Sequence, residues 1–237
     1  MAEKPLGYRN FGSIPHLPNS RMGPGDHACS PGQERIATVR VRDKHDFVTV
    51  TEKLDGSNTG IAKIGREIVP LTRAGYRATD SPYEQHHLFH DWVMANENRF
   101  DAILEDGNRV CGEWLAQAHG TRYDLTGREP WVMFDLFLDA HQREATWEAR
   151  YLADKYGFAV PHLLATEPVS VEEAMSRLGK FGFYGARDPV EGVVYRVERD
   201  GKCDYLCKWV RGDKVDGSYL ESQTGEGPVW NWRPDAG

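Results

Sequence analysis

Alternating apolar and polar residues predict a half-buried strand over residues 47–51, which leads into a polar stretch beginning near Lys53. A second apolar run, 61–64, is predicted to be the returning strand, and the intervening Asp55 and Gly56 suit a turn. At the end of a strand beside a glycine turn, a lysine can point into a cleft between two sheets. An ordinary hairpin with a surface lysine fits the same pattern.

The flanking segments differ in their periodicity. Residues 36–42 alternate and are predicted to form an amphipathic strand with a basic face, which is either simply solvated or a track for RNA. Residues 67–73 are predicted to form another short strand. Residues 1–34 have no period and are expected to be a loop-like leader. Its apolar and aromatic residues, which allow it to dock on the body, include Tyr8, Ile14, His16 and Leu17.

Three segments have helical signals. The first is expected to begin near Pro82, which suits a first helical turn, and to run to about Arg99. The others cover 144–156 and 170–180, and the second of these opens with capping-box spacing at Ser170. The buried stripe of the first helix is predicted to consist of Leu88, Phe89, Trp92 and Val93.

Histidines on the first helix raise the question of a metal site. His86 and His90 are one turn apart, with His87 beside them. A shared metal would need a third ligand, which is not evident, and the chain has no HExxH pattern. A solvated or capping role is therefore the favoured interpretation.

Two near-continuous apolar runs, 109–115 and 131–138, are predicted strands that each hold one carboxylate, Glu113 and Asp135. Burying a carboxylate is unfavourable unless it is paired or bound. Each is therefore either half of an ion pair with a core arginine or part of a site. Two further strands are predicted at 191–197 and 204–210, with turn residues at 200–202 between them.

Composition limits the class of protein. The chain has 237 residues and 40% hydrophobic content, which suits one domain over 1–237 with a tail at 217–237. The net charge of −7 gives no overall basic field, so any nucleic-acid surface must be local. No apolar run is long enough to span a bilayer, and no signal peptide is recognised. The four cysteines lack a second matching pair, which favours reduced thiols and a cytoplasmic protein over a zinc site.

The unusual residues together suggest phosphoryl chemistry. A lysine nucleophile must lose its proton, and free lysine titrates near about 10.4, so nearby cations or desolvation have to lower its pKa. Carboxylates can hold Mg²⁺ through its waters, and a second lysine can neutralise an attacked phosphate. The candidates at or near strand ends are Lys53, Asp55, Arg73, Glu113, Glu191 and Lys208.

Five short segments, in order along the chain, resemble motifs of the covalent nucleotidyltransferase superfamily of RNA ligases, DNA ligases and mRNA-capping enzymes. They are 53–56 (KLDG), 110–114 (VCGEW), 134–136 (FDL), 191–194 (EGVV) and 206–208 (LCK). Asn58, where DNA ligases and capping enzymes usually have arginine, and Arg73 are closer to the RNA ligase 2-like branch. The leader segment 13–20 (SIPHLPNS) is similar to one that precedes the nucleophile in some phage and bacterial RNA ligases.

The resemblance implies an α+β, ATP-grasp-like nucleotidyltransferase domain with two mainly antiparallel sheets around a nucleotide cleft and flanking helices. It implies an RNA ligase that joins 5′-phosphate and 3′-hydroxyl RNA ends and depends on ATP and on Mg²⁺ or Mn²⁺. The substrates it implies include a nicked duplex. Lys53 would be the nucleophile that becomes bonded to AMP, Lys208 would contact the α-phosphate, and Glu191 and Asp55 would bind metal waters. The other nucleotide-binding residues implied are Glu52, Asn58, Arg73, Glu113 on the ribose and Phe134 on the base.

Two departures from the family pattern leave alternatives open. The fifth motif often has two lysines, but the first position here is Leu206, on the same strand face as Lys208. One cation of the site is therefore missing, and Arg211 is a possible substitute. Residues 211–214 (RGDK) imitate a capping-enzyme pattern, which we interpret as accidental because too few residues follow for an oligonucleotide-binding barrel. GTP-dependent capping and a non-catalytic RNA-end or nucleotide-binding module remain the alternatives; protein partners are not indicated.

Overall fold

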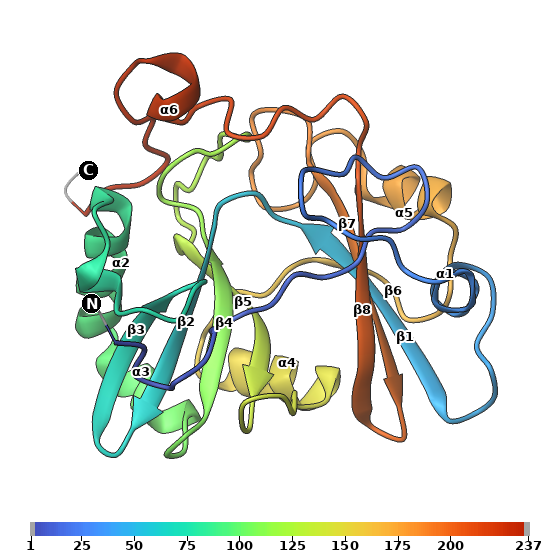
Figure 1. The fold of residues 1–237 in the computed structure, drawn as a ribbon, viewed down its shortest axis with the longest axis horizontal. Coiled ribbons are helices and arrows are strands. Elements are labelled where there is room, and N and C mark those ends of the chain that lie inside the picture. The colour runs from blue at the N-terminus through green and yellow to red at the C-terminus, as the bar shows by residue number, and fades with distance from the viewer. Residues whose placement is uncertain (1–2, 235–237) are drawn as a thin grey trace.

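The structure, a computed structural model, describes residues 3–234 and consists of two four-stranded antiparallel sheets flanked by helices (Figure 1). The predicted α+β class with two antiparallel sheets is confirmed. The first sheet has the order β6-β1-β7-β8 and the second the order β3-β2-β4-β5. The strands are β1 (Asp46–Lys53), β2 (Ser57–Ile64), β3 (Glu67–Thr72), β4 (Arg109–Trp114), β5 (Trp131–Phe137), β6 (Leu163–Ala165), β7 (Gly192–Arg199) and β8 (Lys202–Val210). The helices are α1 (Pro31–Thr38), α2 (Glu84–Ala95), α3 (Glu97–Ile103), α4 (Thr146–Lys155), α5 (Val171–Leu178) and α6 (Glu221–Thr224), with a short 3₁₀ helix at Ala78–Asp80.

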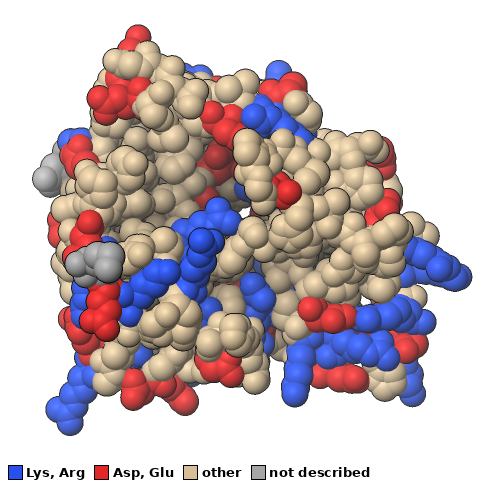
Figure 2. All heavy atoms as spheres, in the orientation of Figure 1, with Lys and Arg blue, Asp and Glu red and all other residues tan. Residues whose placement is uncertain are grey.

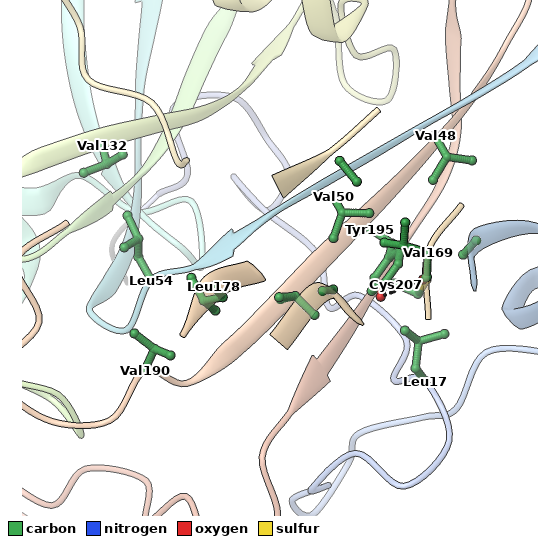
Figure 3. Close-up of a cluster of buried hydrophobic side chains, with 14 of the residues drawn as sticks. Leu17, Val48, Val50, Leu54, Val132, Val169, Leu178, Val190, Tyr195 and Cys207 are labelled. Atoms are coloured by element: carbon green, nitrogen blue, oxygen red, sulfur yellow. Dashed lines mark hydrogen bonds between the residues drawn. The ribbon is translucent and has the colours of Figure 1, made fainter. Parts of the chain in front are cut away.

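One face of the first sheet packs against α5 and α1. Figure 3 shows this cluster, in which Val48 and Val50 of β1 and Tyr195 of β7 lie on the same side of the sheet. Alternation along β1 sends the intervening residues, including Thr49 and Thr51, to the other face, which lines a cleft. The period-2 pattern of the sequence therefore assigns one face to the core and one to the site.

The second sheet packs against α2, α3 and α4 through a cluster of large aromatic side chains. Trp114 of β4 and Trp131 of β5 are fully buried, and Trp92 of α2 contacts both. As predicted, Phe89 and Val93 are also buried, while Leu88 is partly exposed. Among residues 3–234, no helix has the length and apolar character needed to cross a membrane.

The leader docks along the free edge of β8. His16 and Leu17 are buried, and His16 forms an isolated parallel bridge to Lys208. The Leu17 amide donates to the Lys208 carbonyl at 2.8 Å, and the Lys208 amide donates to the Pro15 carbonyl at 3.0 Å. Residues from the start of the chain therefore extend the sheet that carries the fifth motif.

The strand predicted at 36–42 is wrong. Residues 31–38 form α1, because Ser30 and Gln33 make a reciprocal capping box and Pro31 occupies the first turn. The helix predicted from Pro82 to about Arg99 is in fact two helices, α2 and α3, separated at Asn96.

The hairpin predicted around Lys53 is also wrong. Strand β1 pairs with β6 and β7, whereas β2 pairs with β3 and β4. The stretch from Leu54 to Gly56 carries the chain from one sheet to the other. Because strand pairing is set by contacts remote in sequence, the local turn signal could not reveal this crossover.

Candidate active site

A cleft of about 690 Å³ opens between the two sheets, and all nine residues predicted for the site line it. Figure 2 shows a hollow in this face of the molecule in which both acidic and basic side chains lie. The nine are Glu52, Lys53, Asp55, Asn58, Arg73, Glu113, Phe134, Glu191 and Lys208.

Lys53 stands where the chain crosses between the sheets. Gly56 passes so close to β4 that a Cβ atom there would be 2.4 Å from the Trp114 carbonyl oxygen, so glycine is needed for this approach. The Asp55 amide is 3.0 Å from the hydroxyl oxygen of Tyr123, which accepts its hydrogen bond. These contacts fix the crossover and with it the position of Lys53.

The Lys53 ammonium is held by a carboxylate from the neighbouring strand. Its Nζ is 2.5 Å from Oε2 of Glu191, which immediately precedes β7. Burial pulls the pKa of Lys53 down, but Glu191, Glu113 and Asp55 outweigh burial, so the pKa of Lys53 lies above its ordinary value. The expectation that nearby cations or desolvation lower this pKa is therefore wrong, because three carboxylates close to Lys53 favour its charged form.

Asp55 is held by a lysine that the sequence analysis dismissed. The Nζ of Lys214 forms an ion pair with Oδ2 of Asp55 and donates to the Thr121 hydroxyl oxygen at 3.1 Å. Oδ2 also accepts from the Gly120 amide at 3.1 Å. Lys214 is buried, so the last residue of the 211–214 pattern has a defined place beside the site. Its sequence signal was that pattern, which resembles one in capping enzymes and does not indicate burial against Asp55.

Replacing Lys214 with methionine is expected to lower the free energy of unfolding by about 3 kcal/mol, because Asp55 would remain charged in a largely buried position. Urea unfolding at pH 7 measures the difference. The double variant Lys214→Met/Asp55→Asn, which leaves no lone charge, is expected to recover most of the loss. A single variant as stable as the unmodified protein would contradict this account.

Glu113 and Asn58 face the cleft from the second sheet, where they are directly opposite each other on β4 and β2. Oε1 of Glu113 accepts a hydrogen bond from the Gly56 amide at 2.9 Å, and burial raises the pKa of Glu113 to about 7. The Asn58 Oδ1 atom is buried and has no hydrogen-bond partner among the described residues, 3–234. A buried amide oxygen without a partner is unfavourable, and a ligand with a donor group would satisfy it.

Aromatic side chains form another part of the wall. Phe134 of β5 lines the cleft and contacts the edge of Phe11, a leader residue, with ring centroids 5.2 Å apart. Phe134 is only partly buried, which leaves part of its ring available to a base. Arg73 lies nearby on the exposed rim, where its Nη2 reaches the Gly12 carbonyl oxygen at 3.4 Å.

Lys208 and Leu206 both line the cleft, as predicted for alternate residues of one strand. Burial, and then the charge of Lys53, lower the pKa of Lys208. Its nearest carboxylate is Asp26 of the leader, whose Oδ1 lies 3.8 Å from Nζ. Asp26 also contacts His16 at 3.1 Å, so the leader supplies the counter-ion of the fifth-motif lysine.

Glu52 lines the cleft, but its carboxylate has a structural partner as well. Adjacent strand residues point to opposite faces, and the Glu52 carboxylate accepts from the Phe183 amide at 3.0 Å. The other oxygen, Oε1, is buried and has no hydrogen-bond partner within residues 3–234. Burial raises the pKa of Glu52 to about 7.

This raised pKa predicts a pH-dependent effect of Glu52→Gln. The pKa of this carboxyl rises from 4.5 in the unfolded chain to about 7 on folding. The carboxyl therefore opposes folding once the pH exceeds its pKa in the unfolded chain. The variant is therefore expected to gain up to about 3 kcal/mol at pH 8 and almost nothing near pH 4.5. Urea unfolding at both pH values tests this, and an equal difference at the two would contradict it.

Two other predictions concern single residues. Asp135 proves to be paired with arginines, Arg143 at 2.6 Å and Arg196 at 2.8 Å, as one of its two interpretations proposed.

His86 lines the cleft between two serine hydroxyls, whereas His90 contacts Asp91. Within residues 3–234, no group of three or more His, Cys, Asp or Glu side chains is arranged to hold a metal ion.

Comparison with known protein families gives one match. A sequence model described as RNA ligase matches residues 46–210, which is well over half of the chain. That range contains all five motif-like segments. Comparison with curated proteins found no match.

Solved structures with a similar fold are RNA ligases. A Naegleria gruberi RNA ligase with PPi has a TM-score of 0.52 and 17% identity, covering 77% of this chain and 53% of that one. A variant of the same ligase with ATP and Mn has a TM-score of 0.50 and 16% identity, covering 71% and 51%. An archaeal ATP-dependent RNA ligase has 22% identity, a TM-score of 0.45 and coverages of 70% and 43%. The chain thus spans about half the length of these proteins.

Proposed function

The chain belongs to the RNA ligase family, and from this premise we propose that it is an ATP-dependent RNA ligase acting through a lysyl-AMP intermediate. The observation that carries the proposal is Lys53 lying between the two sheets, 2.5 Å from Glu191 and beside Glu113 and Lys208 in one cleft. Four side chains from four strand ends thereby share one cleft, and their chemistry suits a nucleophile, a base, an acceptor for the ribose and a cation for the phosphate.

In the first step the Lys53 amine attacks the α-phosphorus of ATP, a nitrogen–phosphorus bond forms and pyrophosphate leaves. Lys53 must first lose a proton, and Glu191 is the nearest base. Lys208, held only loosely by Asp26, is free to approach the α-phosphate and neutralise its growing charge. Glu113 would accept hydrogen bonds from the ribose, and Phe134 would contact the adenine ring.

The carboxylates fit a hydrated divalent ion better than a bare one. Asp55 and Glu191 each have one oxygen bound to a lysine, and the other oxygen makes no hydrogen bond within the described chain. Two carboxylates with water and phosphate oxygens are what Mg²⁺ prefers, and Mn²⁺ suits the same donors. Asp55 and Glu191 would hold this ion, which supplies charge neutralisation to the triphosphate. Mn accompanies ATP in one of the similar structures.

In the later steps AMP passes from Lys53 to the 5′-phosphate of an RNA end, and a 3′-hydroxyl then displaces AMP to form the phosphodiester. Asn58 and Arg73, which both line the cleft, would act near the phosphates of the ends in this reaction. The proposed substrates are RNA ends, including those of a nicked duplex. Free thiols at all four cysteines suit a reducing compartment, so the proposed setting is the cytoplasm.

Incubation with ATP labelled in its α-phosphate tests the proposal. The chain is expected to acquire label that survives denaturation and maps to the peptide containing Lys53. GTP in place of ATP separates ligation from capping-type chemistry, because only the matching nucleotide should label the protein. RNA binding without any adduct would instead identify a non-catalytic module and overturn the proposal.

A further inference from the structure

The loop between α5 and β7, residues 179–190, is fixed to the strands that carry the site (Figure 1). The Phe183 amide donates to Glu52, the residue before Lys53, and the Val190 amide, one residue before Glu191, donates to the Lys180 carbonyl at 3.0 Å. Gly182 has a φ of 58°, and a Cβ atom there would be 2.1 Å from Glu52 Oε1. Glycine therefore lets this loop, here termed the aromatic loop, lie against Glu52.

The aromatic loop presents two rings to solvent. Phe181 is 47% and Phe183 45% exposed, although both are large apolar side chains. Phe183 stacks on the His162 ring with centroids 3.6 Å apart and an interplanar angle of 18°. His162 immediately follows Pro161, which lines the cleft. The stacked pair is thus next to the cleft along the chain.

The unpaired charges of this surface are positive. Lys180 lies 5.3 Å from the centroid of the Phe181 ring, and Arg128 lies 5.5 Å from that of Tyr184. Neither forms a salt bridge within residues 3–234. Glu52 beneath the loop also has no salt bridge there, but it is buried, and the partly exposed acidic residues that the loop contains or contacts are paired. The neutralising pairs are Arg122 with Asp188, Arg187 with Asp124, and Arg99 with Glu129.

A further cation continues this surface into the cleft. Arg150 of α4 lines the cleft, and burial lowers its pKa. Its one hydrogen bond in the described chain is to the Pro161 carbonyl oxygen at 3.1 Å, so most of its donors are unused. An anionic strand leaving this end of the cleft would meet Arg150 first and the His162–Phe183 stack next.

We propose that the aromatic loop, with His162 and Arg128, binds unpaired nucleotides of the RNA strand whose end reacts in the cleft. Bases would stack on Phe181 and Phe183, and phosphates would contact Lys180 and Arg128. Exposed aromatic faces alternating with unpaired cations are the combination that binds single strands without regard to sequence. A purely apolar partner would leave the cations unsatisfied. The inference rests on the proposed function, since it supplies that reaction with a binding site for its substrate.

Fluorescence anisotropy of a labelled, 5′-phosphorylated single-stranded RNA, measured with the full chain and without ATP, tests this inference. Each of Phe181→Ala and Phe183→Ala is expected to weaken binding about tenfold, as loss of one stacked base does. Lys180→Gln should lower the slope of log affinity against log salt by about one. Phe181→Leu, which keeps apolar volume without a planar face, should behave like the alanine variant.

The matched control is Tyr151→Ala on α4, an aromatic residue 59% exposed, which is expected to leave RNA affinity unchanged. Urea unfolding shows whether each variant is folded, and labelling by ATP should be as in the unmodified chain. RNA affinity unchanged in both phenylalanine variants would overturn the inference. So would a shift from dimer to monomer without loss of RNA binding, which would identify the surface as a contact between copies. Absence of lysyl label with normal RNA binding would instead reject the proposed catalysis.

Discussion

Lys53→Ala is expected to abolish covalent labelling by ATP, and with it ligation. The amine is the atom that would bond to phosphorus, and no other lysine of the cleft can replace it. Lys208 projects from β8 and is assigned to the α-phosphate, and Lys214 is buried against Asp55. Removal of a covalent nucleophile eliminates the intermediate itself. Gel autoradiography after incubation with labelled ATP and Mg²⁺ measures the effect.

One further variant separates the nucleophilic role of Lys53 from its positive charge, and a variant of another lysine serves as the control. Lys53→Arg retains a cation opposite Glu191 and so avoids a lone buried carboxylate, yet guanidinium does not lose its proton and cannot attack. It should fold normally and remain unlabelled. Lys63→Ala removes a β2 lysine that pairs with Asp101 at 2.7 Å and lies outside the cleft, and full labelling is expected. Label retained by either Lys53 variant would disprove this assignment.

Lys208→Met is expected to slow lysyl-AMP formation by about 10²- to 10³-fold. That is the usual penalty for removing one group that stabilises charge in a transition state. The expected effect is large because Leu206 supplies no second cation on this strand face. Single-turnover labelling at saturating ATP gives the rate. Leu206→Met, a change of similar shape at the neighbouring position, should stay within a few-fold of the unmodified chain.

A Lys208→Met rate close to that of the unmodified protein would show that the α-phosphate is neutralised elsewhere. Other cations that line the cleft are Arg73, Arg150 and Arg196, and Lys214 lies beside it against Asp55. The proposed Arg211 substitute is not among them, since its Nε donates to the Val190 carbonyl at 2.9 Å and its Nη1 contacts Asp213.

Local patterns predicted those parts of the fold that depend on local physics. The turn between β7 and β8 was found from Asp200 and Gly201, which adopt φ values of 50° and 73°. Strand alternation correctly placed Leu206 and Lys208 on one face. The same alternation places the Glu52 carboxylate on the opposite strand face from Lys53, where it accepts from the Phe183 amide.

The errors have two different physical origins. At residues 31–38 the helix signal was present locally, in Ser30, Pro31 and Gln33, and a weak period of two was given more weight. The crossing of β1 and β2 into different sheets has no local signal, since β1 pairs with strands more than a hundred residues away, whereas β2 pairs with β3 and β4. Burial of Lys214 likewise depends on Asp55, a contact across most of the chain.

The pairing of the leader with β8 has a consequence for synthesis of the protein. Residues 15–17 are translated well before their partner, Lys208. A nascent chain therefore has no edge strand for the leader to join, and Asp26 has no lysine to accompany, until β8 has been synthesised. Fragments released early by stalled translation would lack a complete nucleotide site.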